Sequence, residues 1–217
     1  MRITRPPIKN VTALNYASDE QIADFFHMRL TQALKKTTGH IAVAVPRATT
    51  PDPILTQLCE RPLEWERVMV FPTDDCDVAD EHEASAFGSL RSLLEPMGAR
   101  VVRLIEGMNT PHLALEWLTM GEDGSVASLF PSAEPDPRDV QRVRAVSPDE
   151  IAPDAPFARL TLTIPALLDC EEMVFVIRGQ SKRVVFEGAL KGQHDLPVRA
   201  LLEARENDAA MPVTCFY

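Results

Sequence analysis

Residues 118–131 read LTMGEDGSVASLFP, and the rest of the chain can be interpreted outward from them. An apolar run at 113–118 leads into this stretch, two carboxylates lie between Gly121 and Gly124, and a second apolar segment ends at a proline. The pattern predicts a strand that delivers an acidic loop. The two glycines permit positive φ and let backbone N–H groups approach a bound group closely. Carboxylates at the carboxyl end of a strand are candidates for proton transfer, although an acidic turn without a site fits the same spacing.

Short apolar runs alternate with helical patterns along the whole chain. Strands are expected at 11–16, 41–45, 65–71, 100–105, 113–118, 159–165, 173–177 and 211–217. This alternation is typical of an α/β fold, with a mostly parallel Rossmann-like sheet and helices on both faces. We expect a single domain over residues 1–217. Its core should contain Val43, Val45, Val70, Leu115, Leu118, Val174 and Val176.

The first helix has a recognisable start. Ser18 and Gln21 form a capping-box pattern, and apolar residues then recur at helical spacing toward Gly39. Further helices are expected at 53–58, 87–94 and 178–190, and from residue 196 onward. Residues 132–156 are rich in proline and acid, which predicts a covering loop.

Composition limits the possible partners. The chain has 217 residues, of which 45% are hydrophobic and 25% charged, and a formal net charge of −10. This acidic balance argues against binding nucleic acid or an anionic membrane. Residues 1–10 lack the apolar core of a secretory signal or a spanning helix, so we expect a cytoplasmic protein. The four cysteines lack metal-ligand spacing and are expected as reduced thiols, with no metal bound.

Residues 118–131 resemble the Gly-Met-Gly-x-Asp-Gly-His-Thr-Ala-Ser-Leu-Phe-Pro signature of the 6-phosphogluconolactonases, which are relatives of the glucosamine-6-phosphate isomerases. The family has glycine where Thr119 stands. It has histidine, its proposed base, where Ser125 stands. The resemblance covers nearly the whole chain from Ile41 onward, with the motifs in family order.

Three other segments carry the same resemblance. Residues 46–51 resemble a loop with a glycine pair before Ser/Thr-Thr-Pro, and the pair is Arg47-Ala48 here. Residues 74–86 resemble Asp-Glu-Arg-x-Val-Pro followed by His-x-x-Ser-Asn, with Cys76 in place of the arginine. Residues 159–163 and 178–182 resemble the family's Arg-Ile-Thr-Leu-Thr and its strand followed by Gly-x-x-Lys.

The resemblance implies an enzyme that hydrolyses 6-phospho-D-glucono-1,5-lactone to 6-phosphogluconate in the oxidative pentose phosphate pathway. Its substrate would be a phosphorylated sugar lactone, no metal or organic cofactor would be required, and the protein would be a monomer or a homodimer. The implied catalytic residues are Asp74, Asp123 and Ser125. The implied substrate and phosphate ligands are Arg47, Thr49, Thr50, Gly124, Arg159 and Lys182, with the N–H groups of Gly124 and Ser125 facing the oxyanion.

Two other functions remain open. Arg47, Ala48, Cys76 and Ser125 all differ from the signature. A serine hydroxyl is a poor base at neutral pH without a partner that activates it. The chain can therefore be a slow lactonase, or a catalytically impaired homologue that binds a sugar phosphate or a protein partner. Sugar-phosphate isomerase or deaminase activity is the third hypothesis.

Overall fold

The computed structural model describes residues 5–46, 51–133, 135–147, 157–206 and 211–217. Within them, seven strands form one parallel sheet in the order β1-β10-β9-β6-β2-β3-β5. These strands are β1 (Val11–Leu14), β2 (Ile41–Val45), β3 (Val68–Pro72), β5 (Arg100–Val101), β6 (Leu115–Leu118), β9 (Met173–Val176) and β10 (Val213–Phe216). The predicted α/β fold with a mostly parallel sheet is confirmed.

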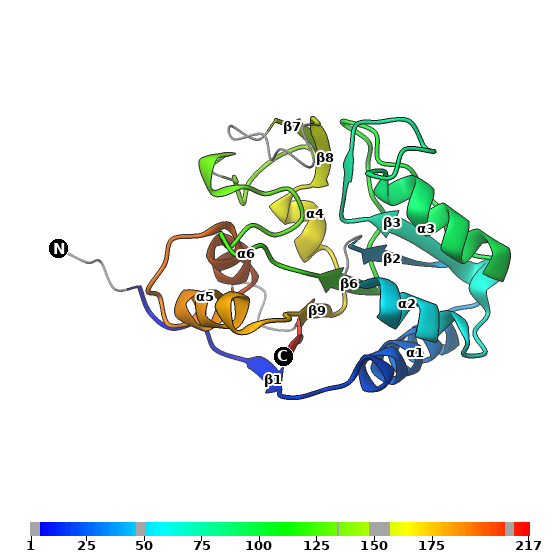
Figure 1. Cartoon of the computed structure of the whole chain (residues 1–217), viewed down its shortest axis with the longest axis horizontal. Helices are drawn as coiled ribbons and strands as arrows, with labels where there is room; N and C mark the ends of the chain where they lie inside the picture. The colour runs from blue at the N-terminus through cyan, green and yellow to red at the C-terminus, as the bar shows by residue number, and fades with distance from the viewer. Residues whose placement is uncertain (1–4, 47–50, 134, 148–156, 207–210) are drawn as a thin grey trace.

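Helices cover both faces of this sheet (Figure 1). The side chains of each buried strand alternate between the two layers, as a strand requires. In β2, for example, Val43 belongs to a core cluster with α1, α2 and α3, whereas Ala44 belongs to a second cluster with α4, α5 and α6. The helices are α1 (Asp19–Lys36), α2 (Pro51–Cys59), α3 (Ala86–Leu94), α4 (Ile164–Leu168), α5 (Gln180–Leu190) and α6 (Pro197–Glu206), with short 3-10 turns η1 (Trp65–Arg67), η2 (Glu95–Met97) and η3 (Pro131–Ala133).

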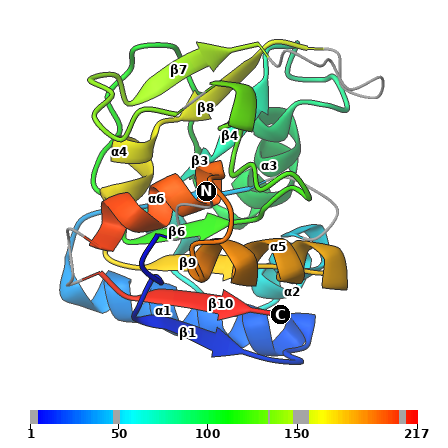
Figure 2. The ribbon, with the colours of Figure 1, turned by 90° about the vertical axis from the view of Figure 1, so that its left-hand side faces the viewer.

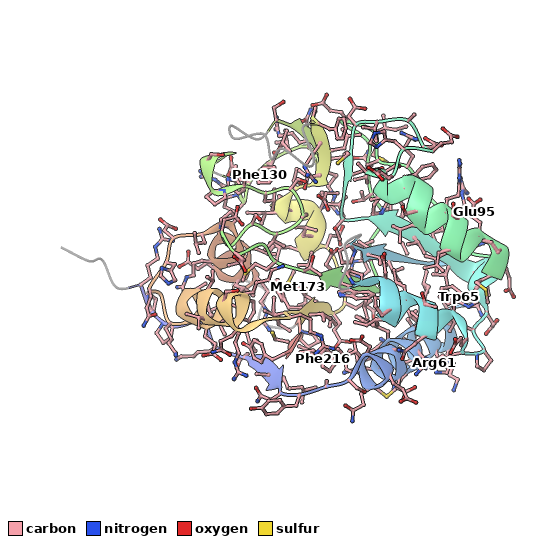
Figure 3. The ribbon with its side chains drawn as sticks, in the orientation of Figure 1. Arg61, Trp65, Glu95, Phe130, Met173 and Phe216 are labelled. Carbon is pink, nitrogen blue, oxygen red and sulfur yellow. The ribbon has the colours of Figure 1, made fainter. Side chains whose placement is uncertain are left out.

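The capping box predicted for the first helix is present. The Gln21 N–H donates to Ser18 Oγ at 3.2 Å, and the Ser18 N–H donates to Gln21 Oε1 at 2.9 Å. The predicted core is also confirmed. Met173 lies in the interior of the molecule, whereas Glu95 lies at its periphery (Figure 3). Every core residue proposed from the sequence is buried: Val43, Val45, Val70, Leu115, Leu118, Val174 and Val176.

A second, smaller sheet was not expected from the sequence. It is antiparallel, with the order β4-β8-β7, and consists of β4 (Asp74–Cys76), β8 (Arg159–Leu162) and β7 (Val143–Val146). Figure 2 shows β7 and β8 at the opposite end of the molecule from β1 and β10. The proline-rich stretch expected as a covering loop thus contributes β7, and the strand at 159–165 belongs to this sheet and ends at Leu162. Only Val143 of β7 is buried. The strand therefore lacks the alternation of buried apolar and exposed polar residues by which a strand is predicted from sequence.

All strands of the main sheet except β2 are shorter than expected, and two of them illustrate why. β3 begins at Val68 because residues 65–67 form the 3-10 turn η1. β5 contains only Arg100 and Val101, since it is an edge strand that pairs with just two residues of β3.

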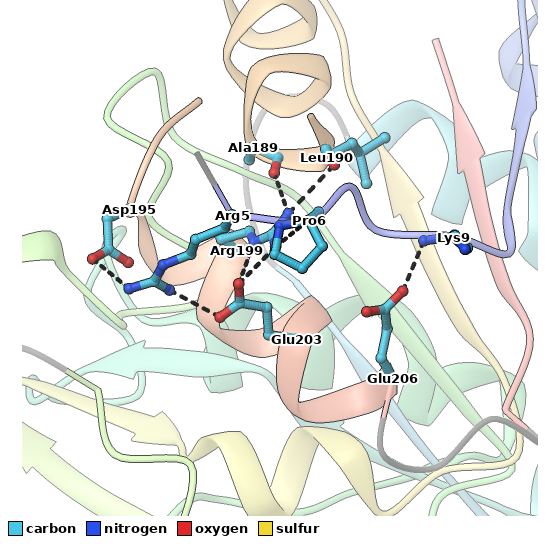
Figure 4. Close-up of polar contacts among 9 residues, drawn as sticks. All are labelled: Arg5, Pro6, Lys9, Ala189, Leu190, Asp195, Arg199, Glu203 and Glu206. Atoms are coloured by element: carbon cyan, nitrogen blue, oxygen red, sulfur yellow. Dashed lines mark hydrogen bonds and ion pairs between the residues drawn. The ribbon is translucent and has the colours of Figure 1, made fainter. Parts of the chain in front are cut away.

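The N-terminal segment is fixed to the last two helices by a buried arginine (Figure 4). Arg199 is 1% exposed and donates to the carbonyl oxygens of Ala189 at 2.9 Å and Pro6 at 2.6 Å. Its Nε also donates to Glu203 at 2.7 Å, and Arg5 pairs with the same glutamate. These bonds hold the start of α6 in place, where it contacts the loop that follows β6.

Among the described residues, none of the helices is both long and apolar enough to cross a bilayer. In the same part of the chain, the cysteines form no disulfide, and no group of three or more His, Cys, Asp or Glu side chains is arranged to hold a metal ion.

Candidate active site at the carboxyl edge of the sheet

Four segments that carry polar residues leave the same edge of the main sheet. β2, β3, β6 and β9 are parallel, so their carboxyl ends lie together. β3 leads directly into Thr73 and Asp74, β6 into the loop 119–130, and β9 into the start of α5. The Thr73 N–H donates to the carbonyl oxygen of Val45 at 3.1 Å, so the end of β2 lies beside Asp74.

Asp74 is held by three side chains. Ser128 Oγ donates to Asp74 Oδ2, and Thr73 Oγ1 donates to Oδ1 at 3.2 Å. Arg159 Nη1 lies 3.7 Å from Oδ2. Burial raises the pKa of Asp74 above its usual range, while the Ser128 hydrogen bond, the charge of Arg159 and the Thr73 hydrogen bond act in the opposite direction. Asp74 is therefore a stronger base than an exposed aspartate and is still supported in its ionised form.

Arg159 lies beside this aspartate, on β8. Its side chain is 23% exposed, and its buried Nε has no hydrogen-bond partner among the described residues. In the register of the small sheet, Arg159 is opposite Cys76. Burial raises the pKa of the Cys76 thiol, Arg159 lowers it, and Asp74 and Asp75 raise it further. A raised pKa makes Cys76 a poor nucleophile.

Asp75 has a structural role at this edge. Its two carboxylate oxygens accept hydrogen bonds from the N–H groups of Ala86 at 2.6 Å and Phe87 at 3.1 Å. The N–H groups in the first turn of a helix have no acceptor within the helix, and a carboxylate is a favourable acceptor for them. Of the adjacent acidic pair, only Asp74 bonds to the loop that follows β6.

The acidic loop closes on itself around two glycines. Gly124 has φ +80°, and a Cβ at this position would lie 2.7 Å from Leu196 Cδ1, so the backbone here requires glycine. The Gly121 N–H donates to the Ser125 carbonyl oxygen at 2.9 Å. Ser125 Oγ donates to Asp123 Oδ1 at 2.6 Å. Asp123 and Ser125 are therefore in direct contact.

The N–H groups of this loop differ from what the sequence led us to expect. The Gly124 N–H donates to the Gly121 carbonyl oxygen at 3.1 Å, and the Ser125 N–H donates to Asp123 Oδ1 at 3.0 Å. Both donors expected to face an oxyanion thus have acceptors inside the turn. The reason is local, because a tight turn with a left-handed glycine directs these N–H groups toward its own oxygens.

The same loop contacts the start of α5. Ser181 Oγ donates to Glu122 Oε1 at 2.7 Å. α5 begins after Gly179, which has φ +94°, and its first turn has neither a side-chain cap nor an acidic residue. Lys182 lies in this first turn and is half-buried. An uncapped helix N-terminus that carries a lysine is suited to binding an anion.

The described contacts link most of the residues proposed from the sequence. Ser128 ties the loop after β6 to Asp74, and Glu122 ties the same loop to the turn that carries Lys182. Arg47, Ala48, Thr49 and Thr50 lie outside the described residues.

Sequence reasoning missed Ser128, Thr161 and Ser181. Ser128 lies inside the opening motif and Thr161 inside the strand motif, so their positions were visible while their hydrogen bonds were not. A 440 Å³ cavity is lined in part by Ser128 and Thr161 together with residues of 135–146.

The fold is that of a doubly wound α/β protein, with carboxylates and an uncapped helix N-terminus at one edge of its sheet. The family profile of glucosamine-6-phosphate isomerases/6-phosphogluconolactonase matches residues 97–211. A 6-phosphogluconolactonase from Mesorhizobium japonicum is 30% identical to this chain, and the match covers 87% of this chain and 86% of that protein. A 6-phosphogluconolactonase from Pseudomonas aeruginosa is 31% identical, and the match covers 81% of this chain and 83% of that protein. The crystal structure of a 6-phosphogluconolactonase from Shewanella baltica shares the fold, with a TM-score of 0.80, 21% identity and coverage of 97% and 98%. The chain belongs to the family of glucosamine-6-phosphate isomerases and 6-phosphogluconolactonases.

Proposed function

We propose that this protein is a 6-phosphogluconolactonase, which hydrolyses 6-phospho-D-glucono-1,5-lactone to 6-phosphogluconate in the oxidative pentose phosphate pathway. Family membership and the names of the relatives support this assignment. The reaction needs an anchor for a phosphate dianion, a base for water and no cofactor. We also place the protein in the cytoplasm.

The phosphate is assigned to the start of α5. Its free N–H groups and the ammonium group of Lys182 provide positive potential. The first turn itself contains no acidic residue, and the carboxylate of Glu122, in the neighbouring loop, is bonded to Ser181 of this turn. Arg47, Thr49 and Thr50 are proposed to complete the anchor, since the connection that carries them starts at the end of β2, beside Asp74.

Hydrolysis is assigned to the two aspartates. The oxygen of a water molecule attacks C1 of the lactone, and a carboxylate takes the proton that this water loses. The bond between C1 and the ring oxygen then breaks, and the ring oxygen receives a proton to give the open-chain acid. Asp74 fits the role of base because its pKa is raised by burial while Arg159 and Ser128 support its anion. Asp123 and Ser125 are proposed to orient the water.

One observation carries this proposal: the loop after β6 is bonded to Asp74 at one point and to the start of α5 at another. The residues assigned as base and as phosphate anchor are therefore both tied to one loop, which supports their assignment to one substrate.

The test is a continuous lactone hydrolysis assay corrected for spontaneous hydrolysis. Lys182→Ala should raise KM for the phosphorylated lactone about tenfold, the cost of one charge-assisted hydrogen bond. Unphosphorylated glucono-1,5-lactone should be hydrolysed equally by both proteins. Lys191→Ala, at the opposite end of α5 and exposed, is the matched control. An equal loss on both lactones would contradict the phosphate assignment.

A binding role without turnover is the second candidate. It is favoured by the internal acceptors of the Gly124 and Ser125 N–H groups, which leave the turn without free donors at these positions for an oxyanion. A rate equal to that of buffer, together with an increase in Tm on adding 6-phosphogluconate, would support this role instead.

A further inference from the structure

The hydroxyl group of Ser128 is fully buried, and its only hydrogen-bond partner among the described residues is Asp74. The side chain is 0% exposed, and Oγ donates to Asp74 Oδ2. A buried hydroxyl is stable only when it is hydrogen-bonded. The Ser128 side chain and the Asp74 carboxylate therefore fix one another.

The neighbouring hydrogen bonds hold the backbone of Ser128 against the small sheet. The Ser128 N–H donates to Thr161 Oγ1 at 3.2 Å, and Thr161 Oγ1 itself donates to the Leu162 carbonyl oxygen at 3.1 Å. Thr161 can therefore act only as an acceptor toward Ser128. Thr161 is also opposite Asp74 in the pairing of β4 with β8, so the small sheet holds both ends of the arrangement.

The backbone before Ser128 is strained. Ala127 has φ +51°, a left-handed conformation that is unfavourable for residues other than glycine. Such strain persists only where the surrounding structure enforces it, and it is concentrated at functional sites. Here it precedes the one residue of the loop that bonds to Asp74.

We propose that Ser128 is a positioning residue of the lactonase reaction, which holds the ionised carboxylate of Asp74 in the orientation that accepts the proton of water. This inference rests on the function proposed above. It assigns Ser128 no contact with the substrate. The phosphate anchor lies at the start of α5, on the other side of the loop, so losing the Ser128 hydroxyl should affect turnover more than substrate binding.

The decisive variant is Ser128→Ala, which removes the hydroxyl and leaves Thr73 and Arg159 as partners of Asp74. We expect kcat to fall about tenfold and KM for the phosphorylated lactone to stay within about twofold of wild type. The acid limb of the kcat profile should move to higher pH by about one unit, because one hydrogen bond to the ionised form is lost. Ser128→Thr, which restores a hydroxyl, should recover part of both effects.

Ser92→Ala is the matched control. Ser92 is an exposed residue of α3, and its hydroxyl donates to the Gly88 carbonyl oxygen at 2.9 Å. Loss of the Ser92 hydroxyl should lower the stability of the fold without moving the acid limb of the kcat profile. If Ser128→Ala also loses stability but keeps the kcat and pH profile of wild type, Ser128 is merely structural and the proposal is wrong.

A measurement without substrate separates this proposal from the proposed function. Carboxyl carbon NMR of Asp74 should show a higher pKa in Ser128→Ala than in wild type. This result in a protein with no lactonase activity would support the control of Asp74 by Ser128 and overturn the reaction assigned to it. An unchanged pKa of Asp74 in an active enzyme would overturn the positioning role alone.

Discussion

Ser181 donates a hydrogen bond of 2.7 Å to Glu122, and this contact joins the acidic loop to the start of α5. Glu122 therefore brings a negative charge to the helix end that we assign to the substrate phosphate. A carboxylate at a helix N-terminus is favourable in the empty protein. In the complex, the same charge would repel the phosphate dianion. We therefore expect Glu122 to lower the affinity for the phosphorylated lactone while it holds the acidic loop against α5.

Glu122→Gln tests this balance. The amide keeps a hydrogen-bond acceptor for Ser181 and removes the charge, so KM for the phosphorylated lactone should fall about two- to fivefold at low ionic strength. The gain should decrease as salt is added, and unphosphorylated glucono-1,5-lactone should show none. A higher KM would mean that the charge of Glu122 instead organises Lys182.

Ser125→His tests the chemistry of the loop. Asp123 Oδ1 lies 2.6 Å from Ser125 Oγ, so it is close enough to orient an imidazole placed at residue 125. A histidine there should take the proton of the attacking water and raise kcat about 10- to 100-fold, at or below the usual contribution of a general base. Its activity should appear as pH rises through about 6.5.

Two further variants check the cause of that gain. Ser125→Ala should give no increase, and Asp123→Asn combined with Ser125→His should lose most of it because the imidazole is no longer oriented. Absence of any gain in Ser125→His would show that the pocket does not place a base at residue 125 near the lactone.

Gly124→Ala tests the contact between the loop and α6. The substitution combines an unfavourable φ of +80° with a Cβ 2.7 Å from Leu196 Cδ1 and 2.9 Å from Leu196 Cβ. We expect the free energy of unfolding to fall by about 2–4 kcal/mol. Gly107→Ala is the control, because φ is +74° there and nothing lies within 4 Å of the added Cβ. It should cost only about 1 kcal/mol. Equal losses in chemical denaturation would rule out the steric contribution of Leu196.

The sequence predicted what depends on local pattern. The buried run of β2 and the capping box of α1 each depend on residues close together in the sequence, and both predictions are confirmed. β4 and β7 were missed because they contain three and four residues, and their pairing with β8 is set by tertiary contacts. The Arg199 network was missed for the same reason, since it joins segments from opposite ends of the chain.

The candidate site likewise has a part that the sequence predicts and a part that only the fold reveals. Asp74 was proposed because it occupies a motif position at the end of a strand. The contact of Ser128 with Asp74 depends on how the loop turns through Ala127, and no spacing in the sequence encodes that turn. The internal acceptors of Gly124 and Ser125 likewise follow from the closed turn and not from residue type.

Glu116 provides a test of the core that is independent of the site. It lies on β6, opposite Ala44 and Met173, and is 0% exposed. Neither carboxylate oxygen has a hydrogen-bond partner among the described residues. Burial raises the pKa of Glu116 well above its ordinary value of 4.5. This carboxyl group is therefore neutral in the folded protein over a range in which the unfolded chain ionises it.

The pH dependence of stability follows from this difference. Below about pH 4.5 the group is protonated in both states and causes no loss. As pH rises from there to the raised pKa of the folded state, the unfolded chain binds fewer protons than the folded one, so stability falls. Glu116→Gln cannot ionise and should remove this decline. Glu116→Leu should also remove the buried polar group and increase the free energy of unfolding at pH 7 by about 1–3 kcal/mol. Urea denaturation at pH 4.5, 6 and 7.5 measures both effects, and a decline in Glu116→Gln as steep as that of wild type would show that another group is responsible.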